Sequence, residues 1–317
     1  MNAIAEAGIA TPQIVWRDVL HEGPVVDAPD ADMLECRARF IAAMKWAPFE
    51  RARAQLEARD RGFAEALSHA DEVVLWFEHD LYDQLQRLQA LDMVARAFRR
   101  RATVTEVQVD DYLGTMQATA LREAYAQRVM VSEATAALGR RAWRAFANDN
   151  PARLEAILDE DLCASPYLAS AIRRWREEFP RIDDGLSRTE RQVLDALARG
   201  IFRTKDLYVA ACHHAESAIF ASDSVFASIL CRLAAGPRPL LAHPDQRAVS
   251  MPESDRDTRV FWEDALLITR AGRDVLAGAT DWMRDAPTRW LGGVRLQGTS
   301  GWRWNAAANG LQQGSSR

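Results

Sequence analysis

The chain contains 317 residues, of which 48% are hydrophobic and 27% are charged, and its formal net charge at pH 7 is −5. This composition is that of an ordinary globular protein and argues against intrinsic disorder. The length exceeds what one minimal core requires, so we expect two packed units. No apolar run reaches the roughly 18 residues that a membrane-spanning helix needs, and Met1 to Thr11 lack the basic-then-apolar order of a secretory signal. The sequence therefore predicts a cytoplasmic protein of bacterial type that makes no membrane contact.

The charge is distributed unevenly along the chain. From Arg181 onward there are 18 basic and 16 acidic residues, which leaves 22 basic and 29 acidic residues before it. The N-terminal part therefore carries about −7 and the C-terminal part about +2. Neither value resembles the strongly basic surface of a dedicated nucleic-acid-binding domain.

The cysteines indicate neither a disulfide framework nor a zinc ribbon, because they are scattered singly. They are Cys36, Cys163, Cys212 and Cys231. His213 and His214 lie between the last two, but adjacent histidines point to different faces of a helix and make a poor ligand pair. The sequence assigns no metal and no cofactor.

The first strand is predicted at Gln13–Leu20, an apolar and β-branched run followed by the turn-forming residues His21–Pro24. A long helical region follows over Asp30–His69, and we expect a break at Pro48 because proline cannot continue a helix. The continuous apolar run Glu72–Phe77 predicts a second, buried strand.

Apolar residues at helical spacing predict an amphipathic helix over Leu81–Arg99. Valines that alternate imperfectly with polar residues predict a third strand over Ala102–Val109. The pattern is helical throughout Gln117–Phe179. Breaks are expected near Val131, Pro151 and Pro166.

The polar, turn-rich stretch Pro180–Gly185 is the predicted domain boundary. Ser187 and Glu190 then form a capping box that starts a helix ending near Gly200. Two more helices, a strand and a short helix are expected at Thr204–Glu216, Asp223–Ala235, Val260–Ile268 and Thr269–Gly278. Three helices followed by a two-stranded wing are typical of a winged-helix domain.

The tail is predicted to form one hairpin from Trp290–Leu296 and Trp302–Trp304, followed by disordered residues from Ala306 to Arg317. The predicted fold class is therefore α/β, with a small parallel sheet and a helical extension, followed by a winged-helix-like α+β domain. The predicted units are an α/β domain at 1–116, a helical extension at 117–180, a winged-helix-like domain with a hairpin tail at 181–305, and a disordered tail at 306–317.

Two of these segments, Trp16–Pro24 and Leu75–Leu85, resemble the signature segments of the family called domain of unknown function 1835. Gly185–Gln192 and Arg289–Gly293 resemble segments of its longer members, so the likeness runs through most of the chain. The resemblance implies no established activity. Family members usually begin with a further strand and a Gly-Asp-Ser-like loop, so the resemblance implies that the α/β domain lacks its first strand. We then expect the DNA upstream of Met1 to encode both.

The two first strands and their helical crossover form a βαβ unit, which is right-handed in nearly all proteins and makes the strands parallel. Polar residues leave both strands at the shared carboxyl edge, where open α/β sheets bind ligands. Asp110 and Asp111 leave the third strand at this edge. The predicted pocket residues are Trp16, Arg17, Asp18, His21, Glu22, Glu78, His79, Asp80, Asp83 and Gln84.

This set has two interpretations. In the functional one, Arg17 binds an anion, His21 or His79 carries a proton, and the acids act as general acids and bases or bind Mg²⁺ or Mn²⁺. In the structural one, Asp18, Asp80 and Asp110 only cap the following helices and Arg17 pairs with one of them. Strand-end acids are common, and no diagnostic spacing separates the two interpretations.

Four functions remain open at this point. The first is a ligand-binding or regulatory protein that senses a small anionic molecule, and the second is a metal-assisted hydrolase or transferase acting on a phosphorylated substrate. The third is a winged-helix regulator that binds nucleic acid through Asp223–Ala235. That segment is mostly apolar, which favours packing or protein contact over base recognition. An interaction module without a pocket is the plainest alternative.

Overall fold

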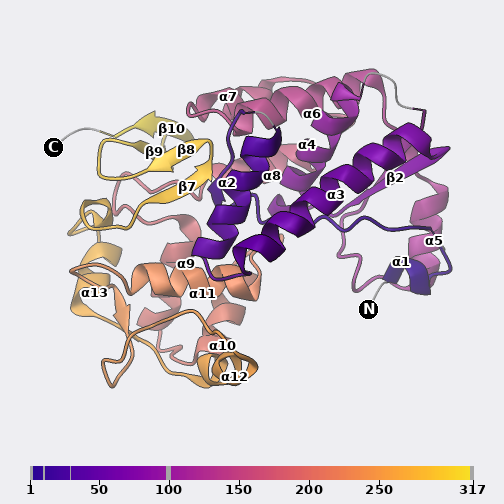
Figure 1. Ribbon diagram of the computed structural model, residues 1–317. Helices are drawn as coiled ribbons and strands as arrows, with labels where there is room; N and C mark the ends of the chain where they lie inside the picture. The colour runs from indigo at the N-terminus through magenta and orange to yellow at the C-terminus, as the bar shows by residue number, and fades with distance from the viewer. Residues whose placement is uncertain (1–2, 10, 29, 98–100, 315–317) are drawn as a thin grey trace.

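The computed structural model describes residues 3–9, 11–28, 30–97 and 101–314, and its elements are arranged as Figure 1 shows. The α-helices are α1 (Ala3–Glu6), α2 (Asp30–Ala43), α3 (Phe49–His69), α4 (Leu81–Arg96), α5 (Ala118–Ala126), α6 (Glu133–Phe146), α7 (Ala152–Glu155), α8 (Leu168–Arg176), α9 (Arg188–Ala198), α10 (Thr204–Tyr208), α11 (Asp223–Leu233), α12 (Asp255–Glu263) and α13 (Arg270–Leu276). Short 3₁₀ segments are η1 (Ala156–Asp159) and η3 (Trp282–Arg284), and η2 (Val209–His214) is a π-helix.

The strands are short and form several small sheets. They are β1 (Gly23–Pro24), β2 (Glu72–Phe77), β3 (Thr103–Gln108), β4 (Val129–Met130), β5 (Leu241–Ala242), β6 (Leu267–Ile268), β7 (Arg289–Gly292), β8 (Val294–Leu296), β9 (Trp302–Asn305) and β10 (Gly310–Gln313). The protein is therefore mixed α/β. Figure 1 shows β2 at one end of the molecule and the β7–β10 hairpins at the other.

The principal sheet has the order β2-β3-β4. Strands β2 and β3 are parallel, with Glu72 opposite Thr103 and Phe77 opposite Gln108, and α4 is the crossover between them. The βαβ unit expected from Gln13–Leu20 and Glu72–Phe77 does not form, because residues 13–20 form no ladder with another strand. Strand β4 pairs antiparallel to β3, so the sheet is mixed, whereas a parallel one was expected. Helix α6 lies close to α4 at Gly139, where an added Cβ atom would be 2.3 Å from the Cβ of Leu91.

The predicted strand Gln13–Leu20 is wrong, because these residues form no ladder with another strand. Its central residue Trp16 packs between two helices instead. The indole lies edge-on to the ring of Phe63 on α3 at 5.1 Å, and its N–H donates to Gln89 Oε1 on α4 at 2.8 Å. An apolar run favours a strand only where a partner strand completes its hydrogen bonds.

The predicted helix breaks are confirmed. Pro48 is the N-cap of α3, and Pro151 is the N-cap of α7. Val131 lies between β4 and α6, and Pro166 precedes α8. The predicted capping box is also present, since Ser187 Oγ accepts from the Glu190 amide at 3.2 Å and Glu190 Oε2 accepts from the Ser187 amide at 2.8 Å.

The predicted strand Val260–Ile268 is wrong in most of its length. Its first residues belong to helix α12, which Ser254 caps by accepting a hydrogen bond from the Asp257 amide at 3.2 Å. Only Leu267–Ile268 form a strand, β6, which pairs antiparallel with β5. A local polar cap therefore outweighed the β propensity of the apolar run.

The C-terminal strands pair differently from the prediction. Strands β7 and β8 form a hairpin within the first predicted run, and β9 pairs with β10 rather than with that run. Residues Gly310–Gln313 thus form a strand where a disordered tail was expected, and 315–317 lie outside the described residues. Strand β7 also pairs in parallel with β1, with Leu291 opposite Gly23.

One hydrophobic core joins the N-terminal and C-terminal parts of the chain, because it extends from Leu20 to Trp304. The ring of Trp175 on α8 is buried in this core, 5.9 Å from the ring of Phe146 and 4.9 Å from that of Phe179. A separate cluster around Phe63 lies against β2 and α4. Among the described residues, no helix is long and apolar enough to cross a bilayer.

Candidate functional site

Polar side chains gather where β2 ends and α4 begins, in the segment Glu78–Gln84, which we call the β2–α4 junction. Asp80 is the N-cap of α4 and accepts from the Asp83 amide at 3.1 Å. Asp83 Oδ2 in turn accepts from the Glu78 amide at 2.7 Å, and Gln84 Nε2 donates to the Glu78 carbonyl at 2.7 Å. Glu78 Oε1 accepts from the Leu113 amide at 2.7 Å. The capping role expected for Asp80 is confirmed. Side-chain hydrogen bonds from Asp83 and Gln84 also fix the amide and the carbonyl of Glu78.

The three carboxyl groups of the junction share one electrostatic feature. Within the described chain, none of Glu78, Asp80 and Asp83 forms an ion pair with an arginine or a lysine. Burial, reinforced by repulsion from Asp83, raises the pKa of Glu78 and the pKa of Asp80 to about 7. Burial also raises the pKa of Asp83. Carboxyl pKa values raised in this way are unusual for groups whose only role is structural.

Aromatic rings surround His79. Its ring centroid lies 5.1 Å from that of Tyr112 and 6.0 Å from that of Tyr167, and its Nδ1 is buried without a hydrogen-bond partner. The Tyr112 hydroxyl accepts a hydrogen bond from the Ile219 amide. Ile219 belongs to the segment between η2 and α11, so Tyr112 links His79 of the junction to the C-terminal part of the chain.

His21 lies between Tyr82 of the junction and Phe220, the residue that follows Ile219. Its ring contacts Tyr82 at 5.9 Å and Phe220 at 5.1 Å, edge-on in both cases. The residue is 2% exposed, and both ring nitrogens lack partners. Burial lowers the pKa of His21 to about 3, so the imidazole is neutral at physiological pH. This environment does not suit the proton-carrying role that the sequence suggested for it.

Asp18 is buried and bound to an arginine that the sequence did not single out. Arg37 donates to Asp18 Oδ1 and Oδ2 at 3.0 and 3.1 Å through Nε. The same guanidinium donates to the carbonyls of Val19 and Glu22 at 2.9 and 2.7 Å, which fixes the loop after Asp18. Arg17, the predicted anion-binding residue, is exposed and forms no ion pair with the described residues. Asp18 therefore pairs with Arg37 rather than with Arg17.

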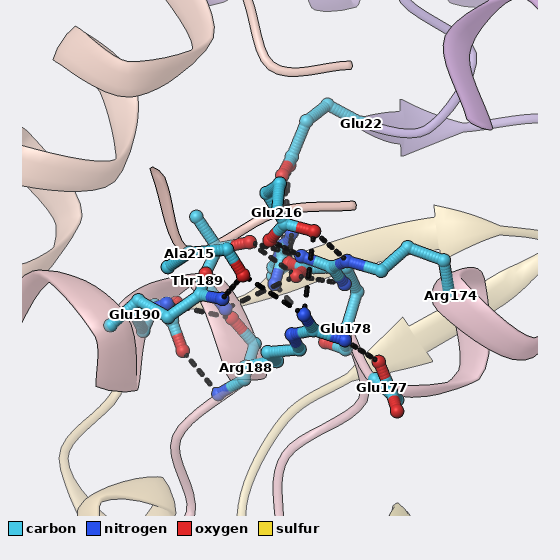
Figure 2. A network of polar contacts seen from close by, with 12 residues as sticks. Glu22, Arg174, Glu177, Glu178, Arg188, Thr189, Glu190, Ala215 and Glu216 are labelled. Atoms are coloured by element: carbon cyan, nitrogen blue, oxygen red, sulfur yellow. Dashed lines mark hydrogen bonds and ion pairs between the residues drawn. The ribbon is translucent and has the colours of Figure 1, made fainter. Parts of the chain in front are cut away.

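Glu22 joins a buried network of ion pairs, shown in Figure 2. Arg289 on β7 binds Glu22 and also donates to Glu178 Oε2 at 2.9 Å. Arg174 on α8 bridges Glu178 and Glu216, at 2.9 and 2.8 Å. This network, which we call the Glu22–Arg289 network, thus connects the N-terminal loop, α8 and the C-terminal strands.

The network is charge-compensated, unlike the β2–α4 junction. Burial opposes ionisation of Glu178, but the guanidinium groups of Arg174 and Arg289 outweigh it and hold the pKa of this carboxyl well below its usual range. Thr189 Oγ1 donates a further hydrogen bond to the same carboxylate at 2.5 Å. Paired charges of this kind stabilise a particular arrangement of the chain and have no obvious need of a ligand.

The structure divides the ten predicted pocket residues among several places. Five lie together at the β2–α4 junction: Glu78, His79, Asp80, Asp83 and Gln84. Asp18 and Glu22 are in ion pairs, His21 contacts Tyr82 at the edge of the junction, and Arg17 is exposed. Trp16 lies between α3 and α4.

Two cavities open elsewhere, and none of these ten residues lines either of them. One, of about 400 Å³, lies among α2, α3, α4 and α6, where Asp30, Asp60, Asp92 and Arg96 face it. The other, of about 310 Å³, lies at α13. In the described part of the chain, no group of three or more His, Cys, Asp or Glu side chains is placed to hold a metal ion.

Several residues around the site were missed by sequence reasoning. They are Arg37, Tyr112, Arg174, Glu178, Glu216 and Arg289. Arg289 had a signal, because it begins the segment Arg289–Gly293 that resembles part of a family. The others sit in helical or loop sequence that reveals no partner, since their pairing depends on tertiary contacts. Comparisons with protein-family models, curated proteins and solved structures find no match for the chain.

Proposed function

We propose that this protein is a ligand-binding regulatory protein whose ligand site is the β2–α4 junction. One observation carries the proposal: Glu78, Asp80 and Asp83 gather without an arginine or lysine partner, beside two buried side chains with unpartnered polar atoms, the ring nitrogens of His21 and Oε1 of Gln84. Unpaired buried polar groups cost stability, and proteins retain them mainly where they serve a function.

The contacts across the junction support a regulatory role. The Tyr112 hydroxyl accepts a hydrogen bond from the Ile219 amide, and Phe220 packs against His21. Both contacts belong to the segment that leads from η2 into α11. A ligand that shifts Tyr112 or His21 would therefore bias the position of α11, which is the kind of differential contact that regulation requires.

We also propose that the chain belongs with the family called domain of unknown function 1835. Among the four segments that carry the resemblance, the first contacts the second and the fourth directly and is linked to the third through Arg232. His21 touches Tyr82, Glu22 binds Arg289, and Arg232 lies 2.7 Å from Glu190 and 4.0 Å from Glu22. Parts of the chain that are far apart in sequence thus lie together around His21 and Glu22.

For the C-terminal part we propose a winged-helix-like arrangement used for packing. Helices α9, α10 and α11 precede the β5–β6 pair, and a bridge between Arg203 and Ala265 adds a third extended stretch. Most of α11 is buried, and Trp46 from the N-terminal part donates to its Ser228 at 3.1 Å. A helix so covered cannot enter a DNA groove without leaving its neighbours. The four free cysteines agree with a reducing cytoplasm, which we propose as the location.

We therefore predict that the full chain binds duplex DNA only weakly and without sequence preference. Fluorescence anisotropy at physiological salt should give a Kd weaker than about 1 μM for every duplex, as for non-specific binding. Nanomolar, sequence-selective binding would contradict the packing role of α11.

An enzymatic role is the second candidate, because Glu78 and Asp80 each have a pKa of about 7. A carboxyl group that titrates near the working pH is well placed to act as a general acid or base. In the described chain, no group of three or more His, Cys, Asp or Glu side chains is placed to hold a metal ion beside it. We therefore keep binding as the proposed function.

Thermal unfolding of the full chain with three classes of probe tests the proposal. The probes are butylammonium, inorganic phosphate and Mn²⁺. At least one class should raise the Tm of the wild type but not that of Asp80→Asn, since a ligand that binds only the folded state stabilises it by mass action. Asp149→Asn, at an exposed position, is the matched control and should respond like the wild type. If no class produces an Asp80-dependent shift, ligand binding at the junction is refuted.

Asp80→Asn alone should also stabilise the protein at pH 8, by about 1–3 kcal/mol, because asparagine preserves the N-cap and removes a buried charge. The pKa of Asp80 is raised on folding to about 7. The folded state therefore holds a proton that the unfolded state has lost between about pH 4 and pH 7, and the penalty is complete above pH 7. The gain should accordingly shrink towards zero near pH 4. Urea denaturation at both pH values, with Asp149→Asn as control, measures it.

A further inference from the structure

The polar atoms that the β2–α4 junction offers are hydrogen-bond acceptors. Glu78, Asp80 and Asp83 contribute carboxyl oxygens, and each uses one oxygen to receive a backbone amide. Glu78 and Asp83 are half-buried, so the cluster reaches solvent. An acceptor-rich site without an arginine or lysine of its own is complementary to a molecule that brings positive charge and N–H donors.

Gln84 supplies an independent observation. Its side chain is fully buried, and its Nε2 donates to the Glu78 carbonyl at 2.7 Å, which holds the amide against the junction. Its Oε1 has no donor. A buried acceptor left open at the edge of a carboxyl cluster indicates a missing donor.

The basic residues nearby are already neutralised. Arg37 is bound to Asp18, and Arg289 is bound to Glu22 and Glu178. Arg174 is held between Glu178 and Glu216. His21 is a neutral imidazole, so none of these groups repels a cation or attracts an anion strongly. Within the junction itself the basic side chain is His79, whose charge offsets part of the rise that burial causes in the pKa of Asp83.

Two aromatic side chains lie beside the junction, around His79. Tyr112 and Tyr167 are half-buried and flank His79 at 5.1 and 6.0 Å. The faces of tyrosine rings attract cations, most strongly where water is partly excluded.

We infer that the β2–α4 junction binds a small organic cation with N–H donors, an alkylammonium or alkylguanidinium group, through Glu78, Asp80 and Gln84. This inference rests on the proposed function and assigns its ligand class. It reverses the charge of the ligand suggested by Arg17, which is exposed and forms no ion pair with the described residues. The 400 Å³ cavity is a weaker candidate, because Arg96 already pairs with both Asp30 and Asp92 there.

The test is an amide NMR titration of the full chain with probes of matched size: butylammonium, butylguanidinium, tetramethylammonium, butanol and butyrate. The two N–H cations should bind at least tenfold more tightly than butanol and tetramethylammonium, and butyrate should not bind. The amides of Leu113 and Asp83 should shift, because they donate to Glu78 and Asp80. Glu78→Gln and Asp80→Asn should each weaken cation binding at least tenfold, and Asp149→Asn should leave it unchanged.

The outcomes separate this inference from the proposed function. Binding of butyrate, phosphate or Mn²⁺ that shifts the same two amides would leave the ligand-binding function standing and overturn the cation. Cation binding that shifts only residues around Asp60 and Asp92 would overturn the site. Equal affinity for butylammonium and tetramethylammonium would overturn the role of the N–H donors, and no binding of either N–H cation would overturn the inference entirely.

Discussion

Replacing Arg289 with methionine is expected to lower the free energy of unfolding by about 3–5 kcal/mol, the cost typical of breaking a buried ion pair by removing one partner. Arg289 is 9% exposed and binds the carboxylates of Glu22 and Glu178. Methionine fills part of the volume, but it removes the close cationic partner of Glu22 and leaves Glu178 with Arg174 alone. Urea denaturation at pH 7 measures the loss.

Arg270→Met is the matched control, because the Arg270 side chain is 94% exposed and its nearest carboxylate, that of Asp274, is 3.9 Å away. Such a surface ion pair contributes little to stability, so the substitution should change the free energy of unfolding by less than about 0.5 kcal/mol. Equal effects of the two substitutions would show that the Glu22–Arg289 network does not hold the two parts of the chain together.

Gly293→Ala is expected to cost about 3 kcal/mol or more, or to prevent folding, because a side chain at this position meets backbone atoms that cannot move aside. An added Cβ would lie 2.2 Å from the Ala147 carbonyl oxygen and 2.6 Å from the Asn148 carbonyl carbon. The Gly293 amide also donates to the Phe146 carbonyl at 2.9 Å, which draws the β7–β8 turn against the end of α6. Circular dichroism and urea denaturation measure the loss.

Gly114→Ala separates this clash from the general effect of replacing glycine. An added Cβ at Gly114 meets no heavy atom within 4 Å. Its substitution should therefore be nearly neutral or slightly stabilising, because alanine has less conformational entropy to lose on folding. If Gly293→Ala lowers the free energy of unfolding no more than Gly114→Ala does, the close approach of β7–β8 to α6 is contradicted.

The elements that sequence reasoning predicted correctly are those whose cause is local. Glu72–Phe77 is strand β2, and the helix predicted from Leu81 begins at that residue. The capping box of Ser187 and Glu190 needs only a four-residue stretch to form. Hydrophobic period and end signals are short-range properties, so a single sequence contains them.

The wrong elements depended on distant partners. Gln13–Leu20 has the composition of a strand, but Trp16 packs against Phe63 and Gln89 on two helices and no strand lies alongside. Gly310–Gln313 has the composition of a tail, but it pairs with Trp302–Asn305. Composition indicates a preference, and the available partner decides the structure.

The same distinction explains what could be predicted of the site. Glu78, Asp80 and Asp83 are neighbours in the sequence, so one strand end places them together. Asp18 and Glu22 were expected to join them, but each found an arginine elsewhere, Arg37 and Arg289. No sequence pattern announces an ion pair between residues as far apart as 22 and 289, because only the folded chain brings them together.

Carboxyl titration by carbon-detected NMR tests the central claim most directly, since that claim is that Glu78 and Asp80 lack a cationic partner in the free protein. Resonances assigned through Glu78→Gln and Asp80→Asn should titrate with midpoints near pH 7, because burial and the neighbouring Asp83 raise the pKa of each group to about 7. The groups that face them are Asp83, Asp111, His79 and Tyr112. Midpoints near pH 4 for both groups, the ordinary range of exposed carboxyls, would contradict the account.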